Sequence, residues 1–511
     1  MKLSGRALAK VDRESDLYRS LAKAHLKIAQ KDPQTWGSKA AAEAALRLNW
    51  VDLPDTSRAL LPELAALCEK FSSLSRIVLC GMGGSSLGPE VISKTFKKEI
   101  FIFDSTDPNY VTHALNGDLS RTLVIVSSKS GSTIETTSQR SFMEEAMKGA
   151  GLDPINHFLF ITDPGSPLDT EVRSQGFTVI NADPMVGGRF SVLGAFGLTP
   201  AALAGVPAVT ILSAARDEKL SLLDQPQMAL DTAYLFATQT EQYIAFTDAD
   251  SELPGLSDWI EQLIAESTGK NSVGRLPIVS ENLSSATSGN FLSVGYSGNS
   301  ADLIVEGSLG AHFIFWEWVT ALLGVALKID PFNQPNVTEA KEQTSACLAE
   351  WANQVPELAP TTVDADVEIF GDGQSLKDAL ATLIEDVKDG GYIAIMAYLD
   401  RADDVKISEL RSILANKSGR PTSFGWGPRF LHSTGQFHKG GQKNGSFLQI
   451  TGASKTDYPI PGKDFSFRTL LMAQAIGDNR TLASRKYPLL RLHLQNREAG
   501  IDQILAIART L

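Results

Sequence analysis

The order of hydrophobic and polar positions divides the chain into a helical beginning and two longer regions in which short apolar runs alternate with helical stretches. Residues 12–70 show the helical pattern, in Ala- and Leu-rich runs that break near Pro33 and Pro54. The first alternating region then contains short β-branched and aromatic runs at 76–80, 99–103, 123–126, 158–161 and 177–180. Nearly continuous apolar strands separated by helices are typical of a parallel sheet that is covered on both faces.

A second series of apolar runs follows at 243–246, 276–279, 301–305, 367–370 and 392–398. No clear strand lies between residues 204 and 231, so we expect the two units to join there. The pattern predicts an α/β protein with two doubly wound, parallel-sheet domains of the flavodoxin-like type. The expected parts are a helical N-terminal segment at 1–70, a first domain at 71–215, a second domain at 216–455 and a helical C-terminal segment at 456–511.

Composition then limits the classes of function. The 511 residues are 43% hydrophobic and carry a net charge of −12. Such a protein repels polyanions, so we expect no nucleic-acid partner, and an anionic substrate would need a local cationic pocket. The three cysteines, at positions 68, 80 and 347, indicate neither a disulfide framework nor a metal knuckle, and they fit a reducing cytoplasm.

Two segments bear on the cellular location. The N-terminus begins with basic residues but has no uninterrupted apolar region, so it is not typical of a signal peptide. The longest apolar helix candidate, 312–329, carries His312, Glu317 and Lys328 and is short for a bilayer. We interpret it as a core helix, and we expect a cytoplasmic protein without a membrane partner.

The apolar run at 122–126 leads directly into the segment SSKSGST at 127–133, which a helical stretch follows. Small hydroxyl donors, free backbone N–H groups at a helix start and a lysine ammonium can together hold a phosphate. The alternative is a Ser-rich turn in which Thr133 caps the helix.

A glycine-rich loop, GMGGSSLGP at 81–89, follows the first apolar run. Ser86 stands where a dinucleotide fingerprint has its third glycine, and the loop lacks a Walker lysine, so nucleotide binding is disfavoured. The loop backbone could instead approach a small ligand, with Ser85 as a donor. A tight turn that needs positive φ explains the glycines equally well.

Three further segments carry groups suited to acid–base chemistry. Arg189 follows two glycines that can aim its guanidinium at a developing oxyanion. Gln262 and Glu266 are four residues apart on one helix face, and a desolvated Glu266 could act as a base. Lys341 follows an amide-bearing loop by about two helical turns. The alternatives are a surface arginine, a solvated glutamate and an exposed lysine after a capped helix start.

Histidine is suited to proton transfer near neutral pH, and the chain has seven. His312 lies at the start of the apolar helix, whereas His432 and His438 lie in the segment FLHSTGQFHKGG at 430–441. A histidine on an apolar helix is more often a core residue than a catalyst. Because no H-E-x-x-H or C-x-x-C spacing occurs, we expect no metal site.

In this order, the segments GMGGSSLGP, SKSGST, GGRFS, QLIAESTGK, GAHFIFWEW and FNQPNVTEAK resemble the phosphoglucose isomerases of the sugar-isomerase (SIS) superfamily. PRFLHSTGQFHKGG is similar to the isomerase half of bacterial transaldolase/phosphoglucose isomerase fusions. The resemblance extends from about residue 76 to the C-terminus. The N-terminal segment is far too short for a transaldolase barrel.

The resemblance implies a role for each matching residue. Glu266 takes the position of the catalytic base, Arg189 faces the reacting carbons, and His312 and Lys341 assist ring opening. His312 is the only histidine between the base and the lysine segment, so it is preferred to His432, although the two residues before it depart from the family pattern. The implied substrate-binding residues are Gly84, Ser85, Ser128, Lys129, Ser130, Thr133, Gln262 and Gln334.

The activity that the resemblance implies is the interconversion of glucose 6-phosphate and fructose 6-phosphate through a cis-enediolate, without a cofactor. Two alternatives stay open, a dual phosphoglucose/phosphomannose isomerase and a non-catalytic SIS protein that binds sugar phosphates. In related enzymes the histidine comes from the partner subunit. Both a homodimer and a monomer fit the sequence.

Overall fold

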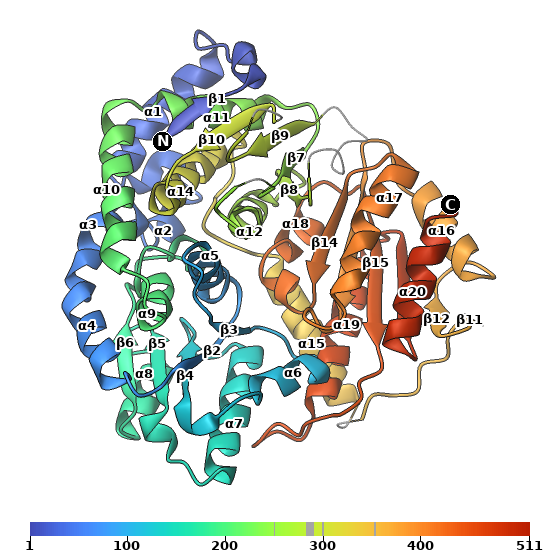
Figure 1. Cartoon of the computed structure of the whole chain (residues 1–511). Helices are drawn as coiled ribbons and strands as arrows, with labels where there is room; N and C mark the ends of the chain where they lie inside the picture. Colours follow the sequence, from blue (N-terminus) through green and yellow to red (C-terminus); the bar gives the residue numbers. More distant parts are fainter. Residues whose placement is uncertain (250, 283–290, 299–300, 352–353) are drawn as a thin grey trace.

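The computed structural model describes residues 1–511 except 250, 283–290, 299–300 and 352–353. Within the described residues three β-sheets form, with helices packed around them (Figure 1). The first sheet has the strand order β3-β2-β4-β5-β6, and all its strands are parallel. Its strands are β2 (Arg76–Gly81), β3 (Phe101–Phe103), β4 (Thr122–Ser127), β5 (Phe158–Thr162) and β6 (Thr178–Asn181).

Helices cover both faces of this sheet, as predicted for a doubly wound unit. Alternate residues of β4 enter different cores: Leu123 shares a core with Val91 of α5, whereas Val124 shares one with Met143 of α7. Side chains of a strand point alternately to the two faces, so a strand that is apolar throughout needs a helix layer on each. The helices of this unit are α5 (Leu87–Thr95), α6 (Pro108–Ala114), α7 (Ile134–Gly149), α8 (Pro167–Ser174) and α9 (Ala195–Leu203).

The second sheet has the strand order β1-β10-β9-β7-β8. The strands are β1 (Lys2–Ser4), β7 (Tyr243–Phe246), β8 (Leu276–Val279), β9 (Leu292–Gly295) and β10 (Leu303–Glu306). The N-terminal β1 runs antiparallel to β10 at the edge, and the other pairs are parallel. The hydrophobic pattern had not indicated β1 or β9. The helices are α10 (Ala208–Asp224), α11 (Gln227–Thr238), α12 (Leu256–Thr268) and α14 (Leu309–Ala326).

A third sheet, with the order β11-β12-β16-β15-β13-β14, corrects the sequence interpretation. The runs at 367–370 and 392–398, expected in the second domain, form β12 and β13 of this sheet, and the segment 456–511, expected to be helical, contains β16. The strands are β11 (Thr362–Asp364), β12 (Val367–Phe370), β13 (Tyr392–Tyr398), β14 (Thr422–Trp426), β15 (Gly445–Gly452) and β16 (Leu489–Leu494). The fold class, α/β with parallel sheets, is confirmed.

The third sheet has a hydrophobic core of its own, and a second cluster joins it to the second sheet. Ile393 and Leu492 contribute to the first of these, while Tyr392 and Met396 pack with Tyr243 in the second. These strands form a sheet separate from the second one because each strand pairs with its neighbours in space. Local periodicity does not specify those neighbours. The surrounding helices are α15 (Val337–Glu350), α16 (Leu376–Glu385), α17 (Leu410–Ser418), α18 (Gly435–Gly440), α19 (Phe467–Ser484) and α20 (Arg497–Ala508).

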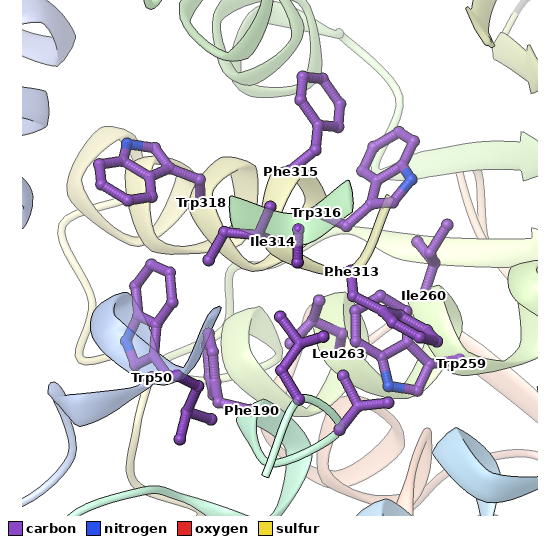
Figure 2. Close-up of a cluster of buried hydrophobic side chains, with 14 of the residues drawn as sticks. Trp50, Phe190, Trp259, Ile260, Leu263, Phe313, Ile314, Phe315, Trp316 and Trp318 are labelled. Carbon is purple, nitrogen blue, oxygen red and sulfur yellow. The ribbon is translucent and has the colours of Figure 1, made fainter. Parts of the chain in front are cut away.

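The N-terminal helices and α14 form much of the largest core. Figure 2 shows Trp50 beside Trp318 of α14, and Phe313 of the same helix beside Trp259, with ring centroids 5.6 and 4.9 Å apart. By length and composition alone α14 could span a membrane, but 89% of it is buried in the molecule. This agrees with its interpretation as a core helix. The N-terminal helices are α1 (Asp16–Ala29), α2 (Ala41–Ala44), α3 (Leu53–Thr56) and α4 (Leu61–Lys70).

A buried ionic cluster joins the first sheet to the third. Glu90 of α5 and Asp104, just after β3, are 6% and 0% exposed. Arg401, just after β13, lies 3.1 Å from Glu90 and 3.3 Å from Asp104. Arg429 lies 3.1 Å from Asp104 and also contacts Glu90. Burial alone would raise the pKa of Glu90, but the two guanidinium groups and the Lys94 ammonium, 2.9 Å away, hold it well below its usual range.

We expect Arg429→Met to lower the free energy of unfolding by about 3–5 kcal/mol, because it leaves two buried carboxylates with a single guanidinium. Urea denaturation followed by circular dichroism would measure this loss. Arg509→Met, which removes an exposed pair with Glu409, is the control and should change stability little. Equal effects of the two substitutions would show that the buried cluster does not hold the sheets together.

Candidate active site

A cavity of about 840 Å³ opens at the carboxyl ends of strands of the first sheet, where open α/β sheets bind ligands. Residues that follow β2, β4, β5 and β6 line it, and α12, the loop before α15 and a turn of the third unit complete its wall. Eleven of the twelve site residues expected from the sequence line this cavity: Gly84, Ser85, Ser128, Lys129, Ser130, Thr133, Arg189, Gln262, Glu266, Gln334 and Lys341.

The segment 127–133 forms a compact hydroxyl-rich loop between β4 and α7. Its turn requires Gly131, which has a φ of +73°. The Oγ atom of Ser128 accepts a hydrogen bond from the Gly131 N–H at 3.1 Å, and the Ser130 and Ser132 hydroxyls lie 2.8 Å apart. Thr133 occupies the N-cap position of α7, yet its side chain makes no capping hydrogen bond. The loop therefore presents hydroxyls beside the positive end of a 16-residue helix.

Lys129 is held at the edge of this loop by a residue that the sequence analysis did not identify. Its ammonium forms an ion pair with Asp163 at 2.5 Å and donates to the carbonyl of Pro184 at 3.1 Å. Burial raises the pKa of Asp163, although Lys129 opposes this shift. A bound anion would share the ammonium with this carboxylate. The position of Asp163 directly after β5 is the signal that could have identified it.

The glycine-rich loop after β2 lies against the turn that carries Arg189. A Cβ atom on Gly84 would lie 2.1 Å from the carbonyl oxygen of Gly188, so only glycine permits this approach. Gly83 has a φ of +57°, and a Cβ there would lie 2.8 Å from the Gln262 amide nitrogen. The two interpretations of this loop are compatible, because it forms a tight turn and also lines the cavity.

Arg189 is a buried clamp between α12 and the loop before α15. Its guanidinium donates to Ser267 Oγ at 2.8 Å, to Gln334 Oε1 at 2.6 Å and to the carbonyl of Pro331 at 2.7 Å. The carboxylate of Glu266 lies 3.4 Å away. Burial lowers the pKa of Arg189, while Glu266 opposes the shift. The arginine therefore sets the position of Glu266 and places a cationic group inside the cavity.

Glu266 and Gln262 lie on one face of α12, as their spacing predicted. The Gln262 amide donates to Glu266 at 3.2 Å and to the main-chain carbonyl of His432 at 2.9 Å. Glu266 is 8% exposed, so its carboxylate is largely shielded from water while it still lines the cavity. Gln262 thus joins the carboxylate to the turn that carries His432.

His432, rather than His312, is the histidine that lines the cavity. It ends the short helical turn Arg429–His432, and its Nε2 donates to Glu135 of α7 at 2.9 Å. The Gln474 amide of α19 donates to the same oxygen at 2.7 Å. Burial alone would raise the pKa of Glu135, but His432 outweighs it and the pKa lies below its usual range. The sequence analysis missed Glu135, an acid in the first turn after the Ser-rich loop.

The structure corrects the expectation for His312. Its side chain is 0% exposed within α14, and it does not line the cavity. Its Nδ1 accepts a hydrogen bond from the Trp316 indole at 3.2 Å, and Tyr296 packs edge-on against the ring. Burial lowers the pKa of His312 to about 3, so it is neutral at physiological pH. His312 is therefore a core residue, as a histidine on an apolar helix usually is.

Outside the cavity, His113, Asp400 and Asp403 bring three possible metal-ligand atoms within 4.8 Å of one another. The Nε2 atom of His113 lies 3.0 Å from Asp400, whose other oxygen accepts the main-chain N–H groups of Ala402 and Asp403. These groups satisfy one another, so the arrangement is an ordinary ionic contact.

Residues 66–289 match a family model described as phosphoglucose isomerase. This segment contains the glycine-rich loop, the Ser-rich loop, Arg189 and Glu266, which line the same cavity. This part of the chain is similar to the phosphoglucose isomerases.

Proteins with curated names are similar to this chain over part of its length. A glucose-6-phosphate isomerase of Campylobacter jejuni is 32% identical over 246 residues, which cover 45% of this chain and 60% of that protein. One of Cyanothece sp. is 37% identical over 213 residues, which cover 38% of this chain and 40% of that protein. The chain therefore matches roughly half of the length of these relatives.

The fold is similar to that of a crystal structure of a glucose-6-phosphate isomerase from Chlamydia trachomatis. The TM-score is 0.54 at 20% sequence identity, and the match covers 68% of this chain and 88% of that chain. At this identity the likeness establishes the fold alone.

We expect Arg189→Met to increase amide hydrogen exchange in residues 331–334 and to lower the free energy of unfolding by about 2–4 kcal/mol, because several buried acceptors lose their donor. Exchange followed by mass spectrometry would localise the effect. Arg47→Met is the matched control, since Arg47 also lines the cavity but pairs only within its own segment. Unchanged exchange in 331–334 would contradict the clamp.

Proposed function

We propose that this protein interconverts glucose 6-phosphate and fructose 6-phosphate by ring opening and proton transfer through a cis-enediolate. The observation that carries the proposal is that the Ser-rich loop and the carboxylate of Glu266 open into a single cavity of about 840 Å³. This volume accommodates a hexose phosphate. The match of residues 66–289 to a family model described as phosphoglucose isomerase supports the same reaction. A non-catalytic sugar-phosphate binder would have no need for Glu266, Arg189 and Lys341 together.

The phosphate binds at the loop 127–133. The free Thr133 hydroxyl, the serine hydroxyls and the start of α7 supply donors, and Lys129 supplies positive charge. Gly84 and Ser85 line the sugar, and Gln262 and Gln334 orient the groups around it. Binding energy gained at the phosphate, remote from the reacting carbons, fixes their orientation for proton transfer.

Glu266 removes the proton from C2 and returns it to C1. Support comes from its restricted position: Gln262 donates to one carboxylate oxygen at 3.2 Å, and Arg189 lies 3.4 Å from the other. Between the two steps the substrate carries negative charge on the enediolate oxygens. The Arg189 guanidinium stabilises this charge, a role in which one donor contributes about 3–4 kcal/mol in other enzymes.

His432 and Lys341 assist ring opening, and His432 takes the role first expected of His312. The His432 imidazole is oriented by Glu135, in the way that a carboxylate orients the catalytic histidine of a serine protease. A histidine held in this way can take a proton from a sugar hydroxyl and deliver one to the ring oxygen. Lys341 lines the same part of the cavity and adds positive charge there.

A single chain supplies all of these groups, so we propose that one chain is catalytically complete and that a homodimer is not required for activity. The net charge of −12 supports the absence of nucleic-acid partners. The three cysteines form no disulfide, which supports a reducing cytoplasm as the site of action.

We expect Glu266→Gln to lower the turnover number by about 10²- to 10⁴-fold, because the amide cannot accept the C2 proton. Affinity for glucitol 6-phosphate, which cannot isomerise, should stay within a few-fold of the wild-type value. A coupled assay and titration calorimetry would measure the two quantities. Glu145→Gln, an exposed position on α7, is the control. Near-normal turnover would exclude Glu266 as the base.

The two histidines give a direct comparison. His432→Gln should reduce turnover about 10²-fold or more with little loss of stability. His312→Gln should lower the melting temperature, because the Trp316 indole loses its acceptor, but the folded protein should keep its turnover number. Steady-state kinetics normalised to the folded fraction would test both, and the opposite ranking would return the catalytic role to His312.

A further inference from the structure

A second cavity, of about 240 Å³, lies in the third unit and shares no lining residue with the catalytic one. β12, β16, the loop after β15 and the beginning of α19 form its walls. Apolar side chains of Val355, Leu358, Leu471 and Met472 make up much of the lining, and Arg491 adds a cationic group. The cavity thus combines apolar walls with two arginines, Arg468 and Arg491, and the carboxylate of Glu368.

The guanidinium of Arg491 is buried and forms no ion pair within the described residues, although the charge of Glu368 is close enough to raise its pKa against the effect of burial. The residue is 5% exposed, and its Cζ atom lies 3.3 Å from the ring centroid of Phe370, its cross-strand partner. Among the residues that the structure describes, nothing accepts a hydrogen bond from this guanidinium or forms an ion pair with it. Burial lowers its pKa to about 10, so it is still a cation at neutral pH.

The neighbouring polar groups already have partners. Glu368 Oε1 accepts a hydrogen bond from the Gln495 amide at 2.8 Å, and His493 Nδ1 lies 2.9 Å from the Thr451 hydroxyl. Arg468 donates to Ser454 Oγ at 2.9 Å. Arg491 is therefore the residue of this wall whose N–H donors have no acceptor within the described residues. A buried cation without an acceptor costs free energy unless a ligand supplies one.

We propose that this cavity binds a small organic carboxylate with a short apolar body, and that Arg491 holds the carboxylate through its two-pronged face. A planar carboxylate matches the guanidinium fork, and the apolar walls match a body of a few carbons. The nearby Glu368 repels a carboxylate monoanion less than a phosphate dianion, so the carboxylate is the better match for Arg491. This site is independent of the proposed isomerase activity.

The test uses the whole chain and isovalerate, a branched five-carbon carboxylate, as the probe. Its melting temperature should rise with isovalerate concentration and reach a plateau. Isovaleramide, which has the same shape without the charge, and sodium chloride at equal ionic strength should give no such rise. If inorganic phosphate replaces isovalerate as the effective anion, or if neither anion shifts the melting temperature saturably, the proposal is wrong.

Two substitutions separate binding from a structural role. Arg491→Met should abolish the isovalerate shift, and Arg491→Lys, which keeps the charge but loses the fork, should raise the half-saturating concentration about tenfold. Without isovalerate, Arg491→Met should melt at or above the wild-type temperature, because it removes an unpaired buried charge and keeps apolar bulk. Arg480→Met, on the same unit but paired with Glu350, is the control. A lower melting temperature of ligand-free Arg491→Met would overturn the proposal by making Arg491 a structural residue.

Discussion

The buried ion pairs of Glu90 and Asp104 with Arg401 and Arg429 are the contact on which the geometry of the cavity of about 840 Å³ depends. The carboxylates belong to the first unit, and the arginines belong to the third. Arg429 also begins the turn that ends at His432, so the contact that joins the two units determines where the imidazole lies. Lys94 also pairs with Glu90, at 2.9 Å, so each buried carboxylate has at least two cationic partners, which is why these charges can be buried.

The cavity concentrates positive charge in a protein that is acidic overall. Arg47, Lys129, Arg189 and Lys341 line it, against the carboxylates of Asp163 and Glu266. The anions are placed beside particular cations: Asp163 pairs with Lys129, and Glu266 lies beside Arg189. An approaching phosphate therefore meets a local positive field, although the net charge of the chain is −12.

Local pattern was sufficient for the first sheet and insufficient for the third. Each strand of the first sheet is a short apolar run between helices, so periodicity and turn residues identify it. The run at 392–398 shows the same apolar pattern as the strands of the first sheet. Whether it joins the second or the third sheet, however, depends on its neighbours, β14 and β15. Strand β16 lies between two long helices, α19 and α20. The helical pattern on both sides of it led to the prediction of a wholly helical segment at 456–511.

The sequence by itself determined the chemistry that is local to a loop or a helix. The hydroxyl loop after β4, the shared face of Gln262 and Glu266, and the turn that aims Arg189 all follow from residues close together in the chain. Only the tertiary structure decided which histidine meets them. His312 lies between the base and the lysine along the chain but faces a packed core, whereas His432 reaches the cavity because the third unit packs against the first. Chain order carries no information about which side of a helix is covered, and contacts between distant segments arise only when the sheets assemble.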